Sequence, residues 1–333
     1  MKRWVLKAGV MDLDALALED VPLPEPGPGE VRIRVHAVSL NARDTMILKG
    51  VFGRLPGRDL VPLSDGAGEV DAIGSGVETW ATGDKVTSLY FDWHSGPPKP
   101  SFGTGLGSDK EDGMLAEYVV LPATRLTRAP ASLDYAEAST LPCAALTAWN
   151  ALFADHSIRV GSKVLVLGTG GVSLFALVFA HAAGAQVFAT TSQDSKQGRL
   201  VALGASDVVN YKTDPNWGKT IFGKTGGVDK VVDAAGTLNE SLEALGYGGE
   251  VVLMGLMTAS EGPPPAFVMM SKNAIIRATS VGSEEMYKVM AQAIDAGGLK
   301  PPIDRRFRFE DAQEAYRAQT APATFGKIVI DLA

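Results

Sequence analysis

A glycine-rich turn between an apolar strand and an apolar helix constrains this chain more than any other feature. Residues 164–167 form a short apolar run, Gly168-Thr169-Gly170-Gly171 follows directly, and an apolar helical pattern continues to about residue 184. Strand, glycine turn and helix are the context that a dinucleotide-binding fingerprint requires. Gly168 permits the tight turn, and Gly170 lets a pyrophosphate approach the backbone. Amides at the helix start, together with the helix dipole, then bind that anion.

The third position of the fingerprint holds Ser173, where the pattern has glycine or alanine. Its side chain is small, so close packing of helix on strand remains feasible. We therefore predict that five residues of the turn contact the cofactor: Gly168, Gly170, Gly171, Val172 and Ser173.

Short apolar runs alternate with helical stretches through the middle of the chain. Six runs predict strands, at residues 164–167, 185–190, 206–211, 228–233, 249–256 and 274–281. Six strands separated by helices predict an α/β fold with a doubly wound parallel (Rossmann) sheet. An apolar helical stretch at 136–153 precedes them, and Asp134 with Glu137 resembles a capping box at its start.

The first third and the last part of the chain have β character instead. Residues 30–38 alternate strictly between polar and apolar, and short strands separated by glycine turns follow at 66–74 and 83–89. After Gly298, strand patterns at 304–309 and 326–331 flank one helix at 311–317. We expect a small barrel-like β domain in two parts, 1–125 and 299–333, around a nucleotide-binding domain at 126–298. Residues 91–112 form a long loop, the candidate lid of a cleft between the domains.

Composition excludes several classes of protein. The 333 residues are 46% hydrophobic and 21% charged, which is ordinary for a globular enzyme, and the net charge of −7 argues against a nucleic-acid surface. The single cysteine, Cys143, rules out an internal disulfide and a cysteine-rich zinc lobe. No apolar run approaches a membrane span, and the first residues lack the apolar core of a signal peptide. The cytoplasm is the expected compartment.

The order of parts resembles the medium-chain dehydrogenase/reductase superfamily over essentially the whole chain. The resemblance is carried by sequence segments at residues 66–74, 83–86, 116–119, 141–149, 168–173 and 325–330. Residues 39–45 and 62–68 are similar to the zinc-independent branch, which holds zeta-crystallin-type quinone oxidoreductases and alcohol dehydrogenase-like proteins. The resemblance implies a GroES-like β-barrel catalytic domain beside the Rossmann domain.

The zinc ligands of alcohol dehydrogenases have no counterparts here. By resemblance the first ligand falls at 41–44, which lacks a cysteine, and the second falls on Ser64, with Asp65 in the place of a glutamate. Only Cys143 remains, and one thiol cannot make a site of three protein ligands. None of the four histidines has ligand spacing; His94, in the long loop, is a weak candidate for a substrate contact. We predict a protein without zinc.

The second predicted strand ends without the acid that normally selects NAD. Residues 189–193 read Ala-Thr-Thr-Ser-Gln, and no carboxylate occurs before Asp194. Small hydroxyls at Thr191 and Ser192 with the cation of Lys196 would accept a 2′-phosphate. The resemblance adds Tyr211 beside that phosphate, so NADPH is the expected cofactor. For Lys196 and its neighbour Arg199, a solvated helix face is the alternative.

The resemblance also implies which residues surround the nicotinamide. Asn41 and Thr147 match positions that contact the nicotinamide and its ribose, Gly255 and Val281 bracket the ring through backbone groups, and Lys327 joins the cofactor-binding set. Some relatives carry a tyrosine acid where this chain has Met46, so the proton donor stays open. Besides Asn41, the catalytic candidates are Asp44 and Asp65. Structural pairing of these carboxylates with a nearby cation is an equal alternative, and solvent can also deliver the proton.

Three functions remain open at this point. The favoured one is an NADPH-dependent reductase of quinones, enones or related carbonyls, since delocalised acceptors need hydrogen-bond donors rather than a metal. The second is an alcohol dehydrogenase working without zinc on a small alcohol or aldehyde. The third is a cofactor-binding structural or sensor protein with negligible turnover. The expected partners are a small-molecule substrate and a second copy of the chain, paired through the strand at 274–281; nucleic acid and membrane are not expected.

Overall fold

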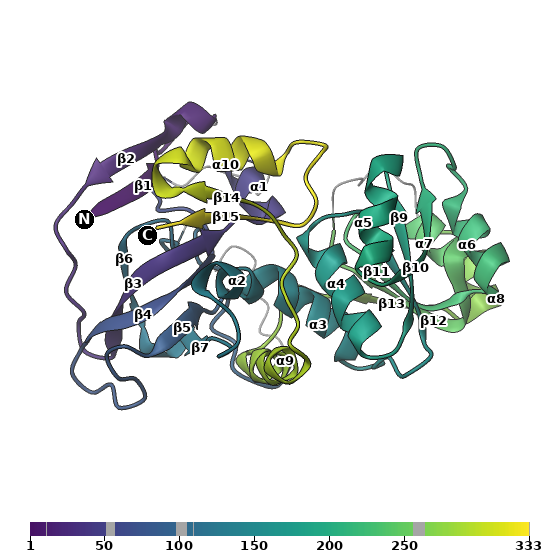
Figure 1. The fold of residues 1–333 in the computed structure, drawn as a ribbon, viewed down its shortest axis with the longest axis horizontal. Coiled ribbons are helices and arrows are strands. Elements are labelled where there is room, and N and C mark those ends of the chain that lie inside the picture. Colours follow the sequence, from purple (N-terminus) through teal and green to yellow (C-terminus); the bar gives the residue numbers. More distant parts are fainter. Residues whose placement is uncertain (11, 51–56, 98–104, 109, 256–263, 333) are drawn as a thin grey trace. The chain divides into compact units, whose positions relative to one another are not determined.

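The computed structural model describes residues 1–10, 12–50, 57–97, 105–108, 110–255 and 264–332. They form two compact units, one of Met1–Leu146 with Gly282–Ala333 and one of Thr147–Val281 (Figure 1). Most of the candidate lid, residues 91–112, belongs to the described part of the chain, but residues 98–104 and 109 do not. The domain boundaries expected at 125/126 and 298/299 stay a prediction.

The first unit is built on a sheet in which the described residues supply seven strands. Their order is β14-β15-β3-β4-β5-β7, with β6 paired to β3 beside that path. The pairs are antiparallel except β14 with β15. The strands are β3 (Glu30–Ser39), β4 (Asp65–Ile73), β5 (Lys85–Ser88), β6 (Tyr118–Pro122), β7 (Leu126–Arg128), β14 (Ile303–Arg308) and β15 (Lys327–Asp331). A separate ribbon joins β1 (Lys2–Leu6) to β2 (Leu16–Asp20).

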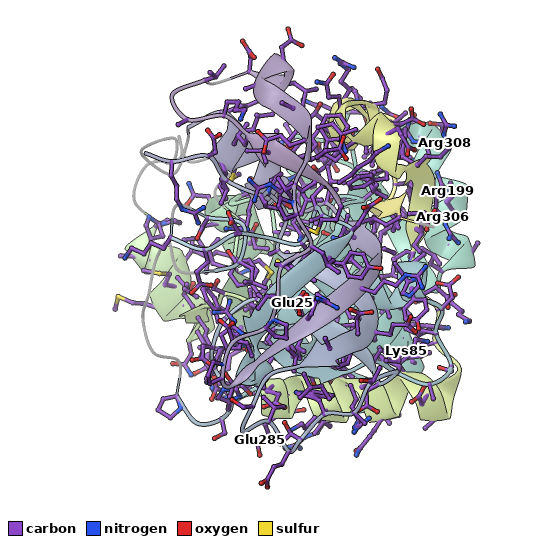
Figure 2. The ribbon with its side chains drawn as sticks, turned by 90° about the vertical axis from the view of Figure 1, so that its left-hand side faces the viewer. Glu25, Lys85, Arg199, Glu285, Arg306 and Arg308 are labelled. Atoms are coloured by element: carbon purple, nitrogen blue, oxygen red, sulfur yellow. The ribbon has the colours of Figure 1, made fainter. Side chains whose placement is uncertain are left out.

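The alternation predicted for residues 30–38 is confirmed in β3. Val31, Ile33 and Val35 are almost completely buried, whereas Arg34 between them is exposed. Arg306, Arg308 and Glu285 of this unit lie at the margin of the molecule in Figure 2. The β domain expected in the first and last parts of the chain is thus present as one sheet.

Helices of the first unit pack around this sheet. They are α1 (Ala42–Leu48), α2 (Tyr135–Ser139), α9 (Glu284–Gly297) and α10 (Ala312–Gln319), with short 3-10 turns η1 (Leu13–Ala15), η2 (Ala123–Arg125) and η5 (Phe309–Asp311). The capping box predicted at Asp134 and Glu137 is present at the start of α2. The helical stretch predicted at 136–153 is interrupted by a π-helical turn, η3 (Leu141–Ala145), before α3 (Leu146–Phe153). Pro142 lies in that turn, and a proline cannot donate the hydrogen bond that a regular helix needs there.

The second unit is the predicted doubly wound sheet. Its described residues form six parallel strands in the order β10-β9-β8-β11-β12-β13, which is the order of two mononucleotide-binding halves. They are β8 (Lys163–Leu167), β9 (Gln186–Thr191), β10 (Ala205–Asn210), β11 (Val228–Asp233), β12 (Leu245–Leu253) and β13 (Ile275–Ala278). Figure 1 shows α4 (Gly171–Ala182) and α5 (Gln197–Ala202) on one side of the sheet. On its other side lie α6 (Trp217–Thr225), α7 (Leu238–Ala244) and α8 (Ala266–Lys272). A 3-10 turn, η4 (Asp194–Lys196), precedes α5.

The centre of this sheet positions the glycine turn. Val164, Leu165 and Val166 of β8 are fully buried, as expected for a strand covered on both faces. β8 lies between β9 and β11, where the strand order reverses. Ligands of such sheets bind at that reversal, beyond the carboxyl ends of the strands. Among the described residues, no helix is both long and apolar enough to cross a membrane.

Candidate active site and nucleotide-binding turn

The glycine turn after β8 leaves open space beside its backbone. Gly168 has a φ of +79°, and a Cβ built on Gly168 or Gly170 would meet no atom within 4 Å. Helix α4 begins at Gly171 with Gly170 as its N-cap. The residues present therefore fit a pyrophosphate, because free amides and room for an anion occur together at a helix start.

Ser173 differs from the other predicted contacts of this turn. Its side chain is buried, and Oγ donates to the carbonyl oxygen of Leu167 at 2.6 Å. The hydroxyl thereby ties the first turn of α4 to the end of β8. Gly168, Gly170, Gly171 and Val172 line the turn itself, so Ser173 contributes mainly by holding the helix against the strand.

The carboxyl ends of β9 and β10 bring together most residues expected at the 2′-phosphate. Thr191 and Asn210 lie opposite each other in the paired strands, and Tyr211 donates its N–H to the carbonyl of Thr191. Lys196 is only 6% exposed and donates from Nζ to Oγ1 of Thr169 at 3.1 Å, so it does not lie on a solvated helix face. Arg199 is exposed, as that alternative predicts. Lys196 thus places a cation against the glycine turn.

The acid that follows this strand is already engaged. Asp194 Oδ1 accepts hydrogen bonds from Asn210 Nδ2 and Gln197 Nε2, both at 2.8 Å. Thr191 Oγ1 accepts from the N–H of Gln193 at 3.2 Å. These contacts hold Asp194 in the local turn.

The remaining predicted contacts of this unit lie at other strand and helix ends. A Cβ on Gly255 would come within 2.0 Å of the Ala234 carbonyl oxygen, so this position requires glycine. Val281 follows β13 in a left-handed conformation with φ of +55°, and Thr147 is buried on α3.

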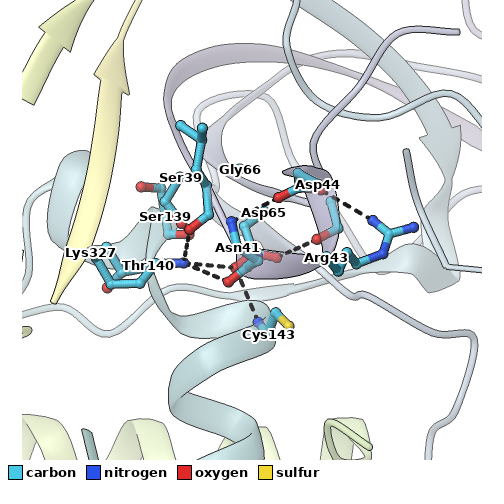
Figure 3. Close-up of polar contacts among 12 residues, drawn as sticks. Ser39, Asn41, Arg43, Asp44, Asp65, Gly66, Ser139, Thr140, Cys143 and Lys327 are labelled. Atoms are coloured by element: carbon cyan, nitrogen blue, oxygen red, sulfur yellow. Dashed lines mark hydrogen bonds and ion pairs between the residues drawn. The ribbon is translucent and has the colours of Figure 1, made fainter. Parts of the chain in front are cut away.

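In the first unit, Lys327 and Asn41 form the centre of a buried polar cluster (Figure 3). Lys327 Nζ donates to Asn41 Oδ1 and to the Leu40 carbonyl oxygen, both at 2.6 Å, and lies 3.9 Å from Asp65 Oδ2. Burial lowers the pKa of Lys327, and the carboxylate of Asp65 opposes this shift. Asn41 Nδ2 is buried and has no hydrogen-bond partner among the described residues. The cluster therefore holds one amide N–H₂ group that is available to a ligand.

The two candidate carboxylates have different surroundings in this cluster. Asp44 Oδ2 accepts from the N–H of Asn41 at 2.8 Å, and its Oδ1 lies 3.4 Å from Arg43 Nη1. Burial raises the pKa of Asp44 to about 6. Asp65 accepts from Ser64 Oγ at 2.7 Å and from the N–H of Cys143 at 3.2 Å. Both carboxylates thus stabilise the local backbone, and a catalytic role for either one remains a proposal.

The possible metal donors do not gather into one site. Within the described residues, no three of the His, Cys, Asp and Glu side chains are arranged to hold a metal ion. Cys143 lies on the π-helical turn, and burial raises the pKa of its thiol, which disfavours a thiolate. His36 stacks on Tyr135 at 4.2 Å between ring centroids. His94 lies between Asp92 and Glu284, at 2.8 and 2.7 Å, so both of its ring nitrogens are engaged.

Two contacts of this arrangement could not be found from the sequence. Lys327 and Asn41 are 286 residues apart, and no local pattern relates them. Asn150, whose Nδ2 donates to the Val281 carbonyl oxygen at 2.8 Å, lies in a uniformly apolar run and gave no signal.

Known proteins match the chain in both units. Residues 27–131 match the family described as the alcohol dehydrogenase GroES-like domain, and 171–296 match the zinc-binding dehydrogenase family. A zinc-type alcohol dehydrogenase-like protein of Schizosaccharomyces pombe is 39% identical over 344 residues, covering 99% of each chain. The quinone oxidoreductase of Rattus norvegicus is 29% identical, covering 89% of this chain and 87% of its own.

Solved structures extend the likeness to the whole fold. The crystal structure of an NAD-dependent alcohol dehydrogenase has a TM-score of 0.89 and 34% sequence identity, with complete coverage of both chains. Fold, glycine turn and sequence relatives agree. The chain is therefore an oxidoreductase of the medium-chain dehydrogenase/reductase superfamily, with that superfamily's nucleotide-binding fold.

Proposed function

We propose that this protein is a zinc-independent, NADPH-dependent reductase of quinones, enones or related conjugated carbonyls. The observation that carries the proposal is the buried cluster of Lys327, Asn41 and Asp65, in which a cation and an amide donor occupy the candidate catalytic site. Bound NADPH would supply the hydride. The chain supplies hydrogen-bond donors, which suffice for an acceptor that delocalises its negative charge.

The donor set supports the absence of zinc. A catalytic zinc needs three protein ligands, usually His, Cys or carboxylate. Here an ammonium group lies 3.9 Å from Asp65 Oδ2, and Cys143 is the nearby thiol. A divalent cation beside the ammonium of Lys327 would be repelled, so the residues present do not fit the metal named by the family description.

NADPH is supported by the surroundings of Lys196. Its ammonium group reaches the glycine turn through Thr169, and the nearest acid along the chain, Asp194, is held by two side-chain amides. A solved relative is described as NAD-dependent, and that description belongs to the relative. The relative affinity of the protein for NADPH and NADH is therefore the first quantity to measure.

The proton donor is the least constrained part of the proposal. Asp44, whose pKa is raised to about 6, can hold a proton below about pH 6, while its Oδ2 accepts from the Asn41 N–H. Asn41 Nδ2 is the donor best placed to bind an acceptor oxygen or the nicotinamide end of the cofactor. Asn41→Ala is expected to lower turnover in a protein that still folds. Asp44 keeps its contact with the backbone N–H of residue 41, and Lys327 keeps its contact with the Leu40 carbonyl oxygen.

An assay of purified protein with NADPH and a panel of quinones and enones tests the function. Turnover of the panel that persists in a chelator supports the proposal. Activity that is abolished by the chelator and restored by zinc would contradict it. Nucleotide binding without turnover of any acceptor would favour the structural or sensor alternative instead.

An alcohol dehydrogenase acting on a small alcohol or aldehyde is the second candidate. The names of the relatives favour it, since the S. pombe protein is described as zinc-type alcohol dehydrogenase-like. Oxidation of short alcohols with NADP⁺, measured beside the quinone panel, separates the two. Faster alcohol oxidation at saturating substrate would replace the first proposal.

A homodimer and a cytoplasmic location complete the proposal. Strand β13 is the last strand in the order of its sheet, and Phe267 and Met270 on α8 are about four-fifths exposed. An exposed strand edge beside apolar side chains is a surface that proteins normally cover. Light scattering at micromolar concentration is expected to give the mass of two chains.

A further inference from the structure

Val281 has a backbone conformation that is rare for its residue type. Its φ of +55° lies in the left-handed region, which β-branched residues disfavour, and the residue is only 4% exposed. It follows the end of β13 by three residues, on the carboxyl side of the parallel sheet where ligands of this fold bind. Such conformations persist where surrounding contacts hold them, and they concentrate at ligand-binding sites.

Asn150 supplies a contact that holds Val281. Asn150 is 4% exposed on α3, and its Nδ2 donates to the Val281 carbonyl oxygen at 2.8 Å. The N–H of Val281 donates to no other residue in the described part of the chain. With the carbonyl oxygen occupied, that N–H is the backbone group of Val281 that a ligand can use.

Arg277 fixes which end of the Asn150 amide faces Val281. Arg277 Nη1 donates to Asn150 Oδ1 at 3.1 Å, and Nη2 donates to the Asn150 backbone carbonyl at 3.2 Å. A guanidinium group can only donate, so Oδ1 must face Arg277 and Nδ2 must face Val281. Glu250 Oε1 holds the guanidinium in turn, at 2.9 Å from Nε.

The same carboxylate belongs to a buried ion cluster. Glu250 Oε2 lies 2.6 Å from Lys230 Nζ, and both side chains are almost fully buried. Lys230 Nζ also donates to the carbonyl oxygens of Ala151 and His156. Buried ion clusters carry a desolvation cost and are often no more stabilising than apolar residues of similar size. This cluster orients the Asn150 amide toward the Val281 carbonyl oxygen. Its role is therefore better explained by the positioning of Val281 than by a gain in stability.

We propose that Asn150 is a positioning residue for the nicotinamide end of the bound dinucleotide, acting through the backbone of Val281. Arg277 sets the orientation of its amide. The inference rests on the proposed function, because it takes a nicotinamide nucleotide as the ligand. It implies that the adenosine end of the nucleotide binds independently of Asn150.

Calorimetric titration of the intact protein with two ligands tests this. NADPH carries both ends of the nucleotide, whereas adenosine 2′,5′-bisphosphate carries the adenosine and 2′-phosphate but no nicotinamide. Asn150→Asp is nearly isosteric: it keeps an acceptor for Arg277 and places an oxygen against the Val281 carbonyl oxygen. Affinity for NADPH is expected to fall by about tenfold, and affinity for the bisphosphate to stay within about twofold.

Two further variants keep the test decisive. Arg277→Lys retains a charge beside Glu250 and loses the paired donors to Asn150. The same selective loss of NADPH affinity is expected, and this variant replaces Asn150→Asp in the test if that one does not fold. Asn216→Asp, at an exposed amide of the same unit, is the matched control and is expected to bind both ligands unchanged.

The outcomes separate this inference from the proposed function. Equal loss of NADPH and bisphosphate binding in Asn150→Asp, or no loss of either, would overturn the positioning role. If the unaltered protein binds the bisphosphate but no nicotinamide nucleotide, the proposed function fails, and this inference fails with it. Normal NADPH binding by the unaltered protein and by both variants would remove this inference alone.

Discussion

Two regions of the molecule differ in how they use space: the glycine turn of the second unit and the Lys327–Asn41 cluster of the first unit. The turn keeps space open, since a Cβ at Gly168 or Gly170 meets no atom within 4 Å. The cluster fills space with polar groups that satisfy one another, except for one amide nitrogen. A site for a large anion thus needs little besides exposed backbone, whereas a site for a small reacting group needs side chains held in place.

The largest effect is expected from removing the cation of the cluster. Lys327→Met leaves Asn41 Oδ1 and the Asp65 carboxylate buried without their cation. The free energy of unfolding should fall by about 3 kcal/mol, because breaking a buried charged contact leaves an uncompensated group. Urea denaturation measures this, and an unchanged midpoint would show that the cluster is not held by Lys327.

The pH dependence of stability probes the buried carboxylate of the same cluster. The pKa of Asp44 is raised from 3.8 to about 6, so the protonated carboxyl favours the folded protein. This stabilisation is complete below pH 3.8 and is lost as pH rises through 6. Asp44→Asn cannot ionise and can still accept from the Asn41 N–H. Relative to the unaltered protein it should gain up to about 3 kcal/mol between pH 4 and 7. Asp20→Asn, at an exposed position, is the control and should show no such difference.

Nucleotide preference tests the cation beside the glycine turn. Lys196→Ala should weaken NADPH binding more than NADH binding, by about 1–2 kcal/mol, because one charge-assisted contact with the 2′-phosphate is lost. Arg199→Ala removes an exposed cation from the same segment and should leave the ratio unchanged. Tighter binding of NADH than NADPH by the unaltered protein would contradict the assignment of Lys196.

The smallest effect is expected at two glycines that have equal open space but different backbone conformations. Gly168→Ala meets no atom but requires a non-glycine residue at φ of +79°, so about 1 kcal/mol of stability should be lost. Gly198→Ala, within helix α5 and equally unobstructed, should gain up to about 1 kcal/mol. Thermal unfolding of both variants gives the comparison. A loss at both positions would mean that the space around them is less open than described.

Sequence patterns predicted the parts of the molecule that are local along the chain. The glycine turn, each of the six parallel strands and the capping box at Asp134 are predicted from short segments, because periodicity and turn chemistry act over short ranges. The π-helical turn was missed, since the apolar run at 141–145 does not show how Pro142 distorts a helix. Residues that pair over long separations were also missed, including Arg277 with Asn150, 127 residues apart. Such pairs depend on the assembled sheet.

The division of the first unit between distant parts of the chain has a consequence for its synthesis. Strand β3 pairs with β15, and Lys327 bonds to Asn41 across 286 residues. At ribosomal rates the lysine follows the asparagine by roughly 15 to 60 s. During that interval the nascent β3 presents an unpaired edge, while the contiguous second unit can already complete its sheet. The Lys327–Asn41 cluster is therefore among the last parts of the protein to form, and a chain truncated before residue 327 could build the glycine turn but not the cluster.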